Sequence, residues 1–180
     1  MTAKEKSELL TLARATIIAT VKGQTLPVLA RPAKALESLS GCFVTIKQQG
    51  QLRGCIGSFV SDQPLWQTVR EMAVSAATRD PRFYPMKPAD LEAFELEISV
   101  LSPLRQLQSV EEVQVGIHGI YLIKGAAHGV LLPQVASEYG WDRETFLRQT
   151  CRKAGLPDEA WQKEAEIYIF SAEVFGDTGQ

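Results

Sequence analysis

The chain has 180 residues, of which 45% are hydrophobic and 22% are charged, a mixture typical of an ordered globular protein rather than a disordered one. Its 19 Lys and Arg residues nearly balance its 21 Asp and Glu residues, and a net charge of -2 lacks the basic excess of a nucleic-acid-binding protein. This length fits a single domain over residues 1–180, with room for a smaller lobe within it.

The N-terminus, the apolar runs and the cysteines indicate where the protein resides. The N-terminal residues MTAKEKSELL lack the charged-then-apolar pattern of a signal peptide, and no apolar run approaches the ~20 residues of a membrane helix. The cysteines are Cys42, Cys55 and Cys151, an odd number at wide spacing, which argues against a disulfide framework. We therefore expect a cytoplasmic protein that binds neither membranes nor nucleic acid.

The first predicted element is an amphipathic helix over residues 3–21. Thr2 and Glu5 have the spacing of a capping box. Apolar side chains then recur on one helical face, at Leu9, Leu12, Ala13 and Ile17. Residues 22–40 are rich in Gly and Pro and predict a loop, with room for a short helix at KALESL.

Two strand-like segments follow and predict a hairpin. CFVTIKQ is alternating and rich in β-branched residues, LRGCIGSF repeats the strand pattern, and the polar turn QQGQ joins the two. Asp62 followed by Pro64 is a helix-start arrangement, and helical spacing of apolar residues continues to about Thr78. The next segment, RDPRFYPMKP, holds three prolines and predicts a loop.

The second half of the chain predicts a single strand, a second hairpin, a helix and a last strand. FELEISVLS has the pattern of a half-buried strand, and GIHGIYLIKGAAHGVLLP predicts a second hairpin. Asp142 is a predicted N-cap of a helix that ends near Gly155 and Pro157, and EIYIFSAEVF is the last predicted strand. Because strands occur as hairpins or singly between helices, the fold class is α+β with a mainly antiparallel sheet.

Six specific motifs follow one another along nearly the whole chain. They are LRGCIGSF, RDPRF, ELEISVLSP, the dipeptide HG at His118, LLPQV and CRKAGLP. On these motifs the chain resembles the AMMECR domain family, also called protein A of the AmmeMemoRadiSam system. The resemblance implies an α+β fold with two lobes around a cleft that the LRGCIG segment lines, and association with a Memo-type protein and a radical-SAM protein. It implies no established reaction.

The LRGCIG segment carries the first candidate site. Glycine weakens a strand interior unless a close backbone approach or a bulge needs it, which makes Gly54 and Gly57 candidate ligand-binding positions. They flank Cys55, whose thiol is a nucleophile or metal ligand only as the thiolate, a form that Arg53 could favour. The alternative is a small buried Cys55, with glycines that permit tight packing.

The RDPRF segment carries the second candidate site. Arg79 and Arg82 could hold an anionic group bidentately while Asp80 orients one of the two guanidinium groups. The alternative is a solvated or self-paired loop in which Asp80 caps a turn.

His118 is the third candidate, as a general base or a metal ligand. The alternative is a structural, hydrogen-bonded histidine. A zinc site needs about four ligands, and the chain offers two histidines and three scattered cysteines, so we predict neither a structural metal nor a cofactor. Cys42 and Cys151 lie on apolar faces of predicted elements and are expected to be buried packing residues.

Two hypotheses of different classes follow. In the first, the three candidate regions form a ligand or substrate cleft, in which Cys55 is a nucleophile or redox thiol and His118 is its base. In the second, the protein is a non-catalytic interaction module that presents the glycine-rich hairpin to a Memo-type or radical-SAM partner. The chemical identity of the small-molecule ligand does not follow from these residues.

Overall fold

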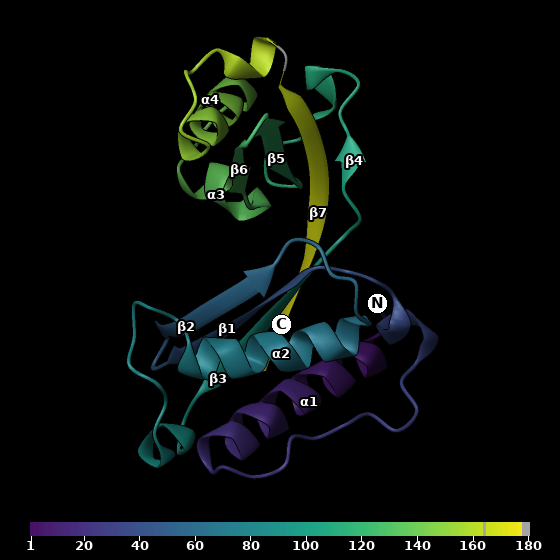
Figure 1. The fold of residues 1–180 in the computed structure, drawn as a ribbon, viewed down its shortest axis with the longest axis vertical. Helices are drawn as coiled ribbons and strands as arrows, with labels where there is room; N and C mark the ends of the chain where they lie inside the picture. Colours follow the sequence, from purple (N-terminus) through teal and green to yellow (C-terminus); the bar gives the residue numbers. More distant parts are fainter. Residues whose placement is uncertain (164, 178–180) are drawn as a thin grey trace. The chain divides into compact units, whose positions relative to one another are not determined.

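The structure is a computed structural model that describes residues 1–163 and 165–177 (Figure 1). The chain divides into two compact units, one made of Met1–Leu101 with the segment that begins at Glu173, the other of Ser102–Ala172. Helices accompany antiparallel strand pairs in both units, which confirms the predicted α+β class. No helix in the described ranges is long and apolar enough to cross a membrane.

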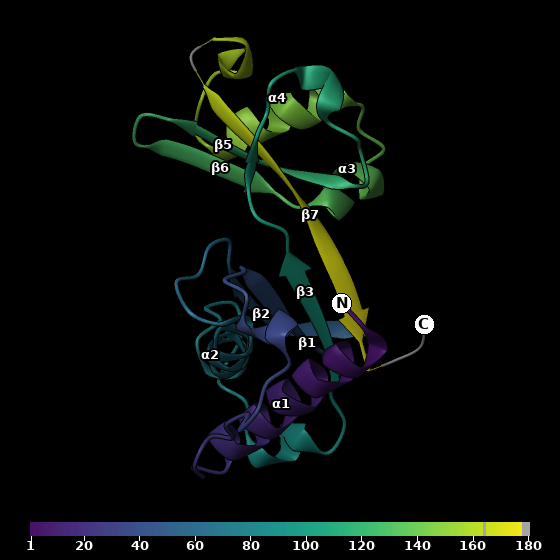
Figure 2. The same ribbon diagram turned by 90° about the vertical axis from the view of Figure 1, so that its right-hand side faces the viewer.

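The first unit packs two helices on a small antiparallel sheet. Its main elements are α1 (Ala3–Val21), β1 (Cys42–Gln48), β2 (Gln51–Ser58), α2 (Leu65–Thr78) and β3 (Glu95–Leu101). β1 lies between β2 and β3 and pairs with both. α2 runs along β1 and β2, and α1 packs beside α2 (Figure 1, Figure 2). Alternate residues of β1 and β3 bury their side chains against these helices and form the core.

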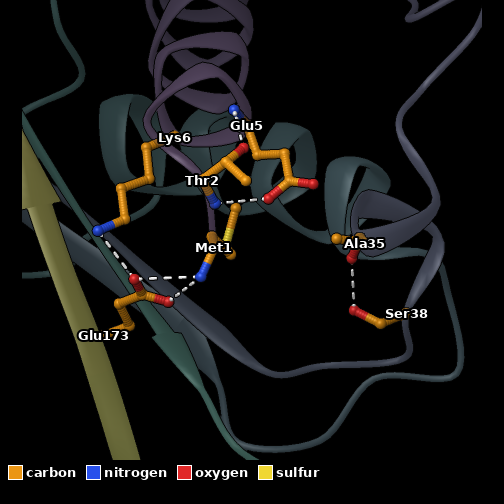
Figure 3. Close-up of polar contacts among 7 residues, drawn as sticks. All are labelled: Met1, Thr2, Glu5, Lys6, Ala35, Ser38 and Glu173. Atoms are coloured by element: carbon orange, nitrogen blue, oxygen red, sulfur yellow. Dashed lines mark hydrogen bonds and ion pairs between the residues drawn. The ribbon is translucent and has the colours of Figure 1, made fainter.

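α1 begins where the capping box predicted. The Thr2 hydroxyl accepts a hydrogen bond from the Glu5 amide at 3.3 Å, and the Thr2 amide donates to Glu5 Oε2 at 2.7 Å (Figure 3). Lys6, one turn into the helix, forms a 2.8 Å ion pair with Glu173, which also accepts a hydrogen bond from the amino group of Met1. α1 is thereby tied to the end of β7 (Glu166–Gly176).

The predicted hairpin is confirmed, with one irregularity. Gln49 and Gly50 form its turn with φ angles of 51° and 74°, the left-handed values that match the twist of a two-residue hairpin. The pairing then shifts between Ile46 and Lys47, because Lys47 lies opposite Leu52 and Ile46 lies opposite Gly54. The skipped residue is Arg53, so the LRGCIG segment contains a β-bulge.

The loop after α2 is as irregular as its prolines predicted. α2 starts at Leu65, directly after the predicted helix-start residues Asp62 and Pro64, with Pro64 as its N-cap and without a side-chain cap. The loop ends in a short 3-10 helix, η2 (Pro88–Leu91). A second 3-10 helix, η1 (Lys34–Glu37), occupies the predicted KALESL position.

The second unit covers one face of its sheet with helices. Its elements are β4 (Arg105–Gln106), η3 (Val110–Glu112), β5 (His118–Lys124), β6 (Ala127–Leu131), α3 (Pro133–Glu138), α4 (Arg143–Lys153), η4 (Ala160–Gln162) and the first part of β7. β5 pairs with β6 and β7, and β4 pairs with β7. Asp142 caps α4 as predicted, since its Oδ1 accepts from the Thr145 amide at 2.8 Å. The short helix α3 was not predicted.

Candidate functional site

Cys55 lies on β2 opposite Thr45 of β1, on the face of the sheet that does not contact the helices. The Thr45 hydroxyl donates to Cys55 Sγ at 3.2 Å, and the cysteine is partly exposed. Cys42 and Cys151 are fully buried, as predicted for packing residues. Burial raises the pKa of the Cys42 thiol to about 12 and also raises the pKa of Cys151. Of the three thiols, Cys55 is therefore the accessible one.

The backbone of Cys55 is bound by the RDPRF loop. In the part of the chain that the structure describes, β2 is an edge strand, whose outward amide and carbonyl groups have no neighbouring strand to pair with. The Cys55 amide donates to Asp80 Oδ2 at 2.8 Å, and Arg82 Nη2 donates to the Cys55 carbonyl at 3.3 Å. The Asp80–Arg82 pair thus occupies the position that a further strand would take.

Asp80 is the centre of this arrangement. Its side chain is only 2% exposed and also accepts from the Arg82 amide at 3.1 Å, Nε at 3.0 Å and Nη2 at 2.7 Å. The hydrogen bonds from the Arg82 guanidinium, followed by those from the Cys55 and Arg82 amides, hold the pKa of Asp80 well below its usual range. The same pair raises the pKa of Arg82. Asp80 therefore both closes a local turn and orients the guanidinium of Arg82.

The two arginines differ in what they can offer a ligand. Arg82 is 55% exposed, but Nε and Nη2 are engaged by Asp80 and Cys55, which leaves Nη1 of the guanidinium for a ligand. Arg82 therefore cannot bind a ligand bidentately through its Nε–Nη2 edge. Arg79 is exposed at the end of α2, and its side chain has no hydrogen bond or ion pair among the described residues.

Among the described residues, Arg53 has no hydrogen bond or ion pair with this cluster. Its Nη2 donates to Asp90 Oδ2 of η2 at 3.1 Å, and its side chain is 17% exposed. The hydrogen bond from the Lys87 amide lowers the pKa of Asp90, and the charge of Arg53 lowers it further. The guanidinium that is hydrogen-bonded to Cys55, at its carbonyl, is therefore that of Arg82, and an effect of Arg53 on the Cys55 thiolate stays a prediction.

The two glycines of the motif allow close approach, as expected, but to other parts of the protein. A Cβ atom on Gly54 would lie 2.2 Å from the Ala76 carbonyl oxygen of α2, on the core side of β2. A Cβ atom on Gly57 would lie 2.3 Å from the ring of Phe43. Both positions hence serve packing around the site, and a ligand role for them stays a prediction.

His118 belongs to the second unit, where it begins β5. Its Nδ1 accepts a hydrogen bond from the Gln114 amide at 3.2 Å. In the neutral imidazole the proton is then on Nε2, so His118 presents a donor, and action as a base requires the bond to Gln114 to break. Because Cys55 lies in the first unit, its pairing with His118 stays a prediction.

Within the described part of the chain, no three His, Cys, Asp or Glu side chains gather in a way that could hold a metal ion. Sequence reasoning missed two residues that shape the site, Thr45 and Asp90. Each meets its partner through tertiary structure.

Comparison with known proteins identifies relatives along most of the chain. Residues 10–175 match the model of the AMMECR1 family. A protein of Methanothermobacter thermautotrophicus is 46% identical over 147 residues, which cover 77% of this chain and 76% of that protein. Protein MK0488 of Methanopyrus kandleri is 45% identical over 154 residues, covering 80% and 74% of the two chains.

A solved structure has the same fold. The crystal structure of the uncharacterised protein PH0010 from Pyrococcus horikoshii superposes with a TM-score of 0.85 at 34% sequence identity. The match covers 98% of this chain and 93% of the other.

Proposed function

The chain belongs to the AMMECR1 family, and from this premise we propose that it acts with a Memo-type protein and a radical-SAM protein. Its own part, in this proposal, is to hold an anionic ligand beside the thiol of Cys55. Arg82 and Arg79 supply the positive charge, and Asp80 keeps the guanidinium of Arg82 in place.

One observation carries the proposal. A buried carboxylate, that of Asp80, fixes a guanidinium that is itself 55% exposed and that also donates to the Cys55 carbonyl. A side chain oriented before the ligand arrives loses little conformational entropy on binding. Arg79, without a partner of its own among the described residues, provides a second cation from the same loop. Cys55 and its Thr45 partner lie beside this loop.

The proposal assigns binding, and it assigns no reaction. Cys55 as nucleophile with His118 as base is the covalent mechanism to test first, and it requires both side chains to meet one substrate.

Protection of Cys55 from alkylation tests the site. Inorganic phosphate and acetate are the probes, and the rate of reaction of the folded protein with iodoacetamide is followed by mass spectrometry. We expect one reactive thiol, Cys55, since Cys42 and Cys151 are buried. At least one of the two anions should slow its alkylation in a saturable way. Equal rates with and without both anions would overturn the proposal.

Matched variants identify the residues responsible. Arg79→Ala should weaken the protection by the anion, whereas Arg31→Ala, which removes another exposed arginine of the same unit, should leave it unchanged. If the two variants behave alike, the anion is acting through general charge and not through this site.

The exposure of Tyr84 favours a second candidate function, that of an interaction module. Tyr84 is 87% exposed in the proline-rich loop, two residues after Arg82, and exposed aromatic side chains are frequent anchors of protein interfaces. In this alternative the loop and hairpin bind a Memo-type or radical-SAM partner without chemistry. Co-purification of the co-expressed partners separates the two, because Tyr84→Ala should then abolish the complex while leaving anion protection of Cys55 intact.

A further inference from the structure

A polar cavity lies between the tip of the first hairpin and η2. Its volume is about 450 Å³, within the roughly 300–1,000 Å³ range of small-molecule sites. It is lined by Gln48, Gln49, Gln51, Leu52, Arg53, Ala89, Glu92 and Ala93. None of Cys55, Arg79 and Arg82 lines it, so the cavity is independent of the site of the proposed function.

The walls of the cavity are held by contacts around Asp90. Gln48 Nε2 donates to the Asp90 carbonyl at 3.0 Å, and Arg53 donates to the Asp90 carboxylate at 3.1 Å. The Lys87 amide donates to the same carboxylate at 2.7 Å. Asp90 thus ties η2 to both strands of the hairpin and sets the position of the Arg53 guanidinium.

A cation and an anion, Arg53 and Glu92, line this cavity, and both have hydrogen-bonding groups that the described residues do not use. The Arg53 guanidinium donates one of its five N–H groups to Asp90, and this side chain has no other hydrogen-bond partner among the described residues. Glu92 lines the same cavity and forms no ion pair in the described ranges, with Arg53 or with any other cation. The side chains of Gln49 and Gln51 likewise have no hydrogen-bond partner among the described residues, so their amide groups remain open to a ligand.

We propose that this cavity binds a small zwitterion, an amino acid or a short peptide, whose carboxylate contacts Arg53 and whose ammonium group contacts Glu92. A guanidinium is the side-chain group best suited to bind a carboxylate, and a glutamate carboxylate accepts hydrogen bonds from the N–H groups of an ammonium ion. The glutamine amides can donate to and accept from a peptide bond. A ligand with one charge alone would meet only one of these two charged groups, whereas a zwitterion meets both.

An NMR titration tests the proposal. The ¹⁵N-labelled protein is titrated with the dipeptide Gly-Gly, with glycine and with acetate, and the backbone amide signals are followed. We expect saturable shifts at residues that line the cavity, such as Gln51, Leu52 and Ala93, with Gly-Gly or glycine. The tighter of these two ligands distinguishes a peptide site from an amino-acid site. Absence of saturable shifts with both would overturn the proposal.

Variants separate recognition of the zwitterion from general charge effects. Glu92→Gln should weaken binding of the zwitterion by about tenfold, the effect of one charge-assisted hydrogen bond, and leave acetate binding unchanged because acetate has no ammonium group. Glu71→Gln, which alters an exposed glutamate of α2 outside the cavity, should leave both unchanged. Equal effects of the two substitutions would overturn the assignment of Glu92.

Discussion

At the scale of single residues, Asp80 is the charged side chain that the fold most completely encloses. It is the one buried charged residue among those described, and its carboxylate accepts hydrogen bonds from both Cys55 and Arg82. Asp80→Asn keeps the shape of the side chain and removes its charge. We expect the free energy of unfolding in urea to fall by about 2 to 3 kcal/mol at neutral pH, because charge-assisted hydrogen bonds are lost.

The pH dependence of this effect follows from the lowered pKa of Asp80. In the unfolded chain an aspartate has a pKa of about 3.9, and in the folded protein the pKa of Asp80 lies below that value. The contribution of Asp80 to stability is therefore complete above about pH 5 and is lost as the pH falls below about 4. The difference in unfolding free energy between the wild type and Asp80→Asn should shrink over the same acidic range.

Asp158 offers a matched control. It accepts from Arg152 Nε at 2.7 Å and Nη2 at 2.6 Å, the same pair of contacts that Asp80 makes with Arg82, but on the surface. Solvent screens such a pair, so Asp158→Asn should cost much less than Asp80→Asn. Similar losses in both variants would show that the burial of Asp80 has no special effect.

The residue scale is also where prediction from the sequence was weakest. A regular hairpin counted outward from the Gln49–Gly50 turn would place Thr45 opposite Gly54. The bulge at Arg53 moves Thr45 opposite Cys55 instead, where it reaches the thiol. The partner of Arg53, Asp90, is 37 residues away along the chain. Contacts of this kind depend on tertiary packing, which no local pattern specifies.

At the scale of elements, Gly54 links the hairpin to α2. The Ala76 carbonyl oxygen lies 2.2 Å from where a Cβ atom on Gly54 would be, and a helix backbone cannot rotate away as a side chain can. Gly54→Ala should therefore force β2 and α2 apart and lower the free energy of unfolding by about 3 kcal/mol or more.

Leu52→Ala is the control for Gly54→Ala, since Leu52 is 41% exposed on the same strand. Its thermal denaturation midpoint should stay close to that of the wild type, as for most surface substitutions. A Gly54→Ala variant as stable as Leu52→Ala would mean that the two elements separate at little cost.

Elements with strong end signals were predicted well, and short ones were not. α1 and α4 have the expected starts because Thr2 and Asp142 cap them. α3 spans only Pro133–Glu138, too few residues for a helical period to be recognised, and it follows directly on the apolar end of β6. The two-residue strand β4, which pairs with β7, is too short to show an alternating pattern.

At the scale of the whole molecule, the described residues form two hydrophobic cores. One gathers residues of the first unit, among them Ile17 and Phe175, and the other gathers residues of the second unit, among them Phe146 and Ile169. β7 contributes to both, with Ile169 in one and Phe175 in the other. The composition predicted a chain that buries a core, but nothing in it distinguishes one core from two.

Because the two cores are separate, truncation of a buried side chain in one core should destabilise mainly the unit that contains it. Phe146 and Ile17 are both fully buried, and truncation to alanine should cost about 3 to 5 kcal/mol for Phe146 and 2 to 5 kcal/mol for Ile17. Hydrogen exchange reports where stability is lost, because amides exchange through the local opening of their own unit. Phe146→Ala should lower protection in β5 and β6 more than in β1, and Ile17→Ala should do the reverse. An equal loss of protection in both units with either variant would show that the two cores unfold together as one cooperative structure.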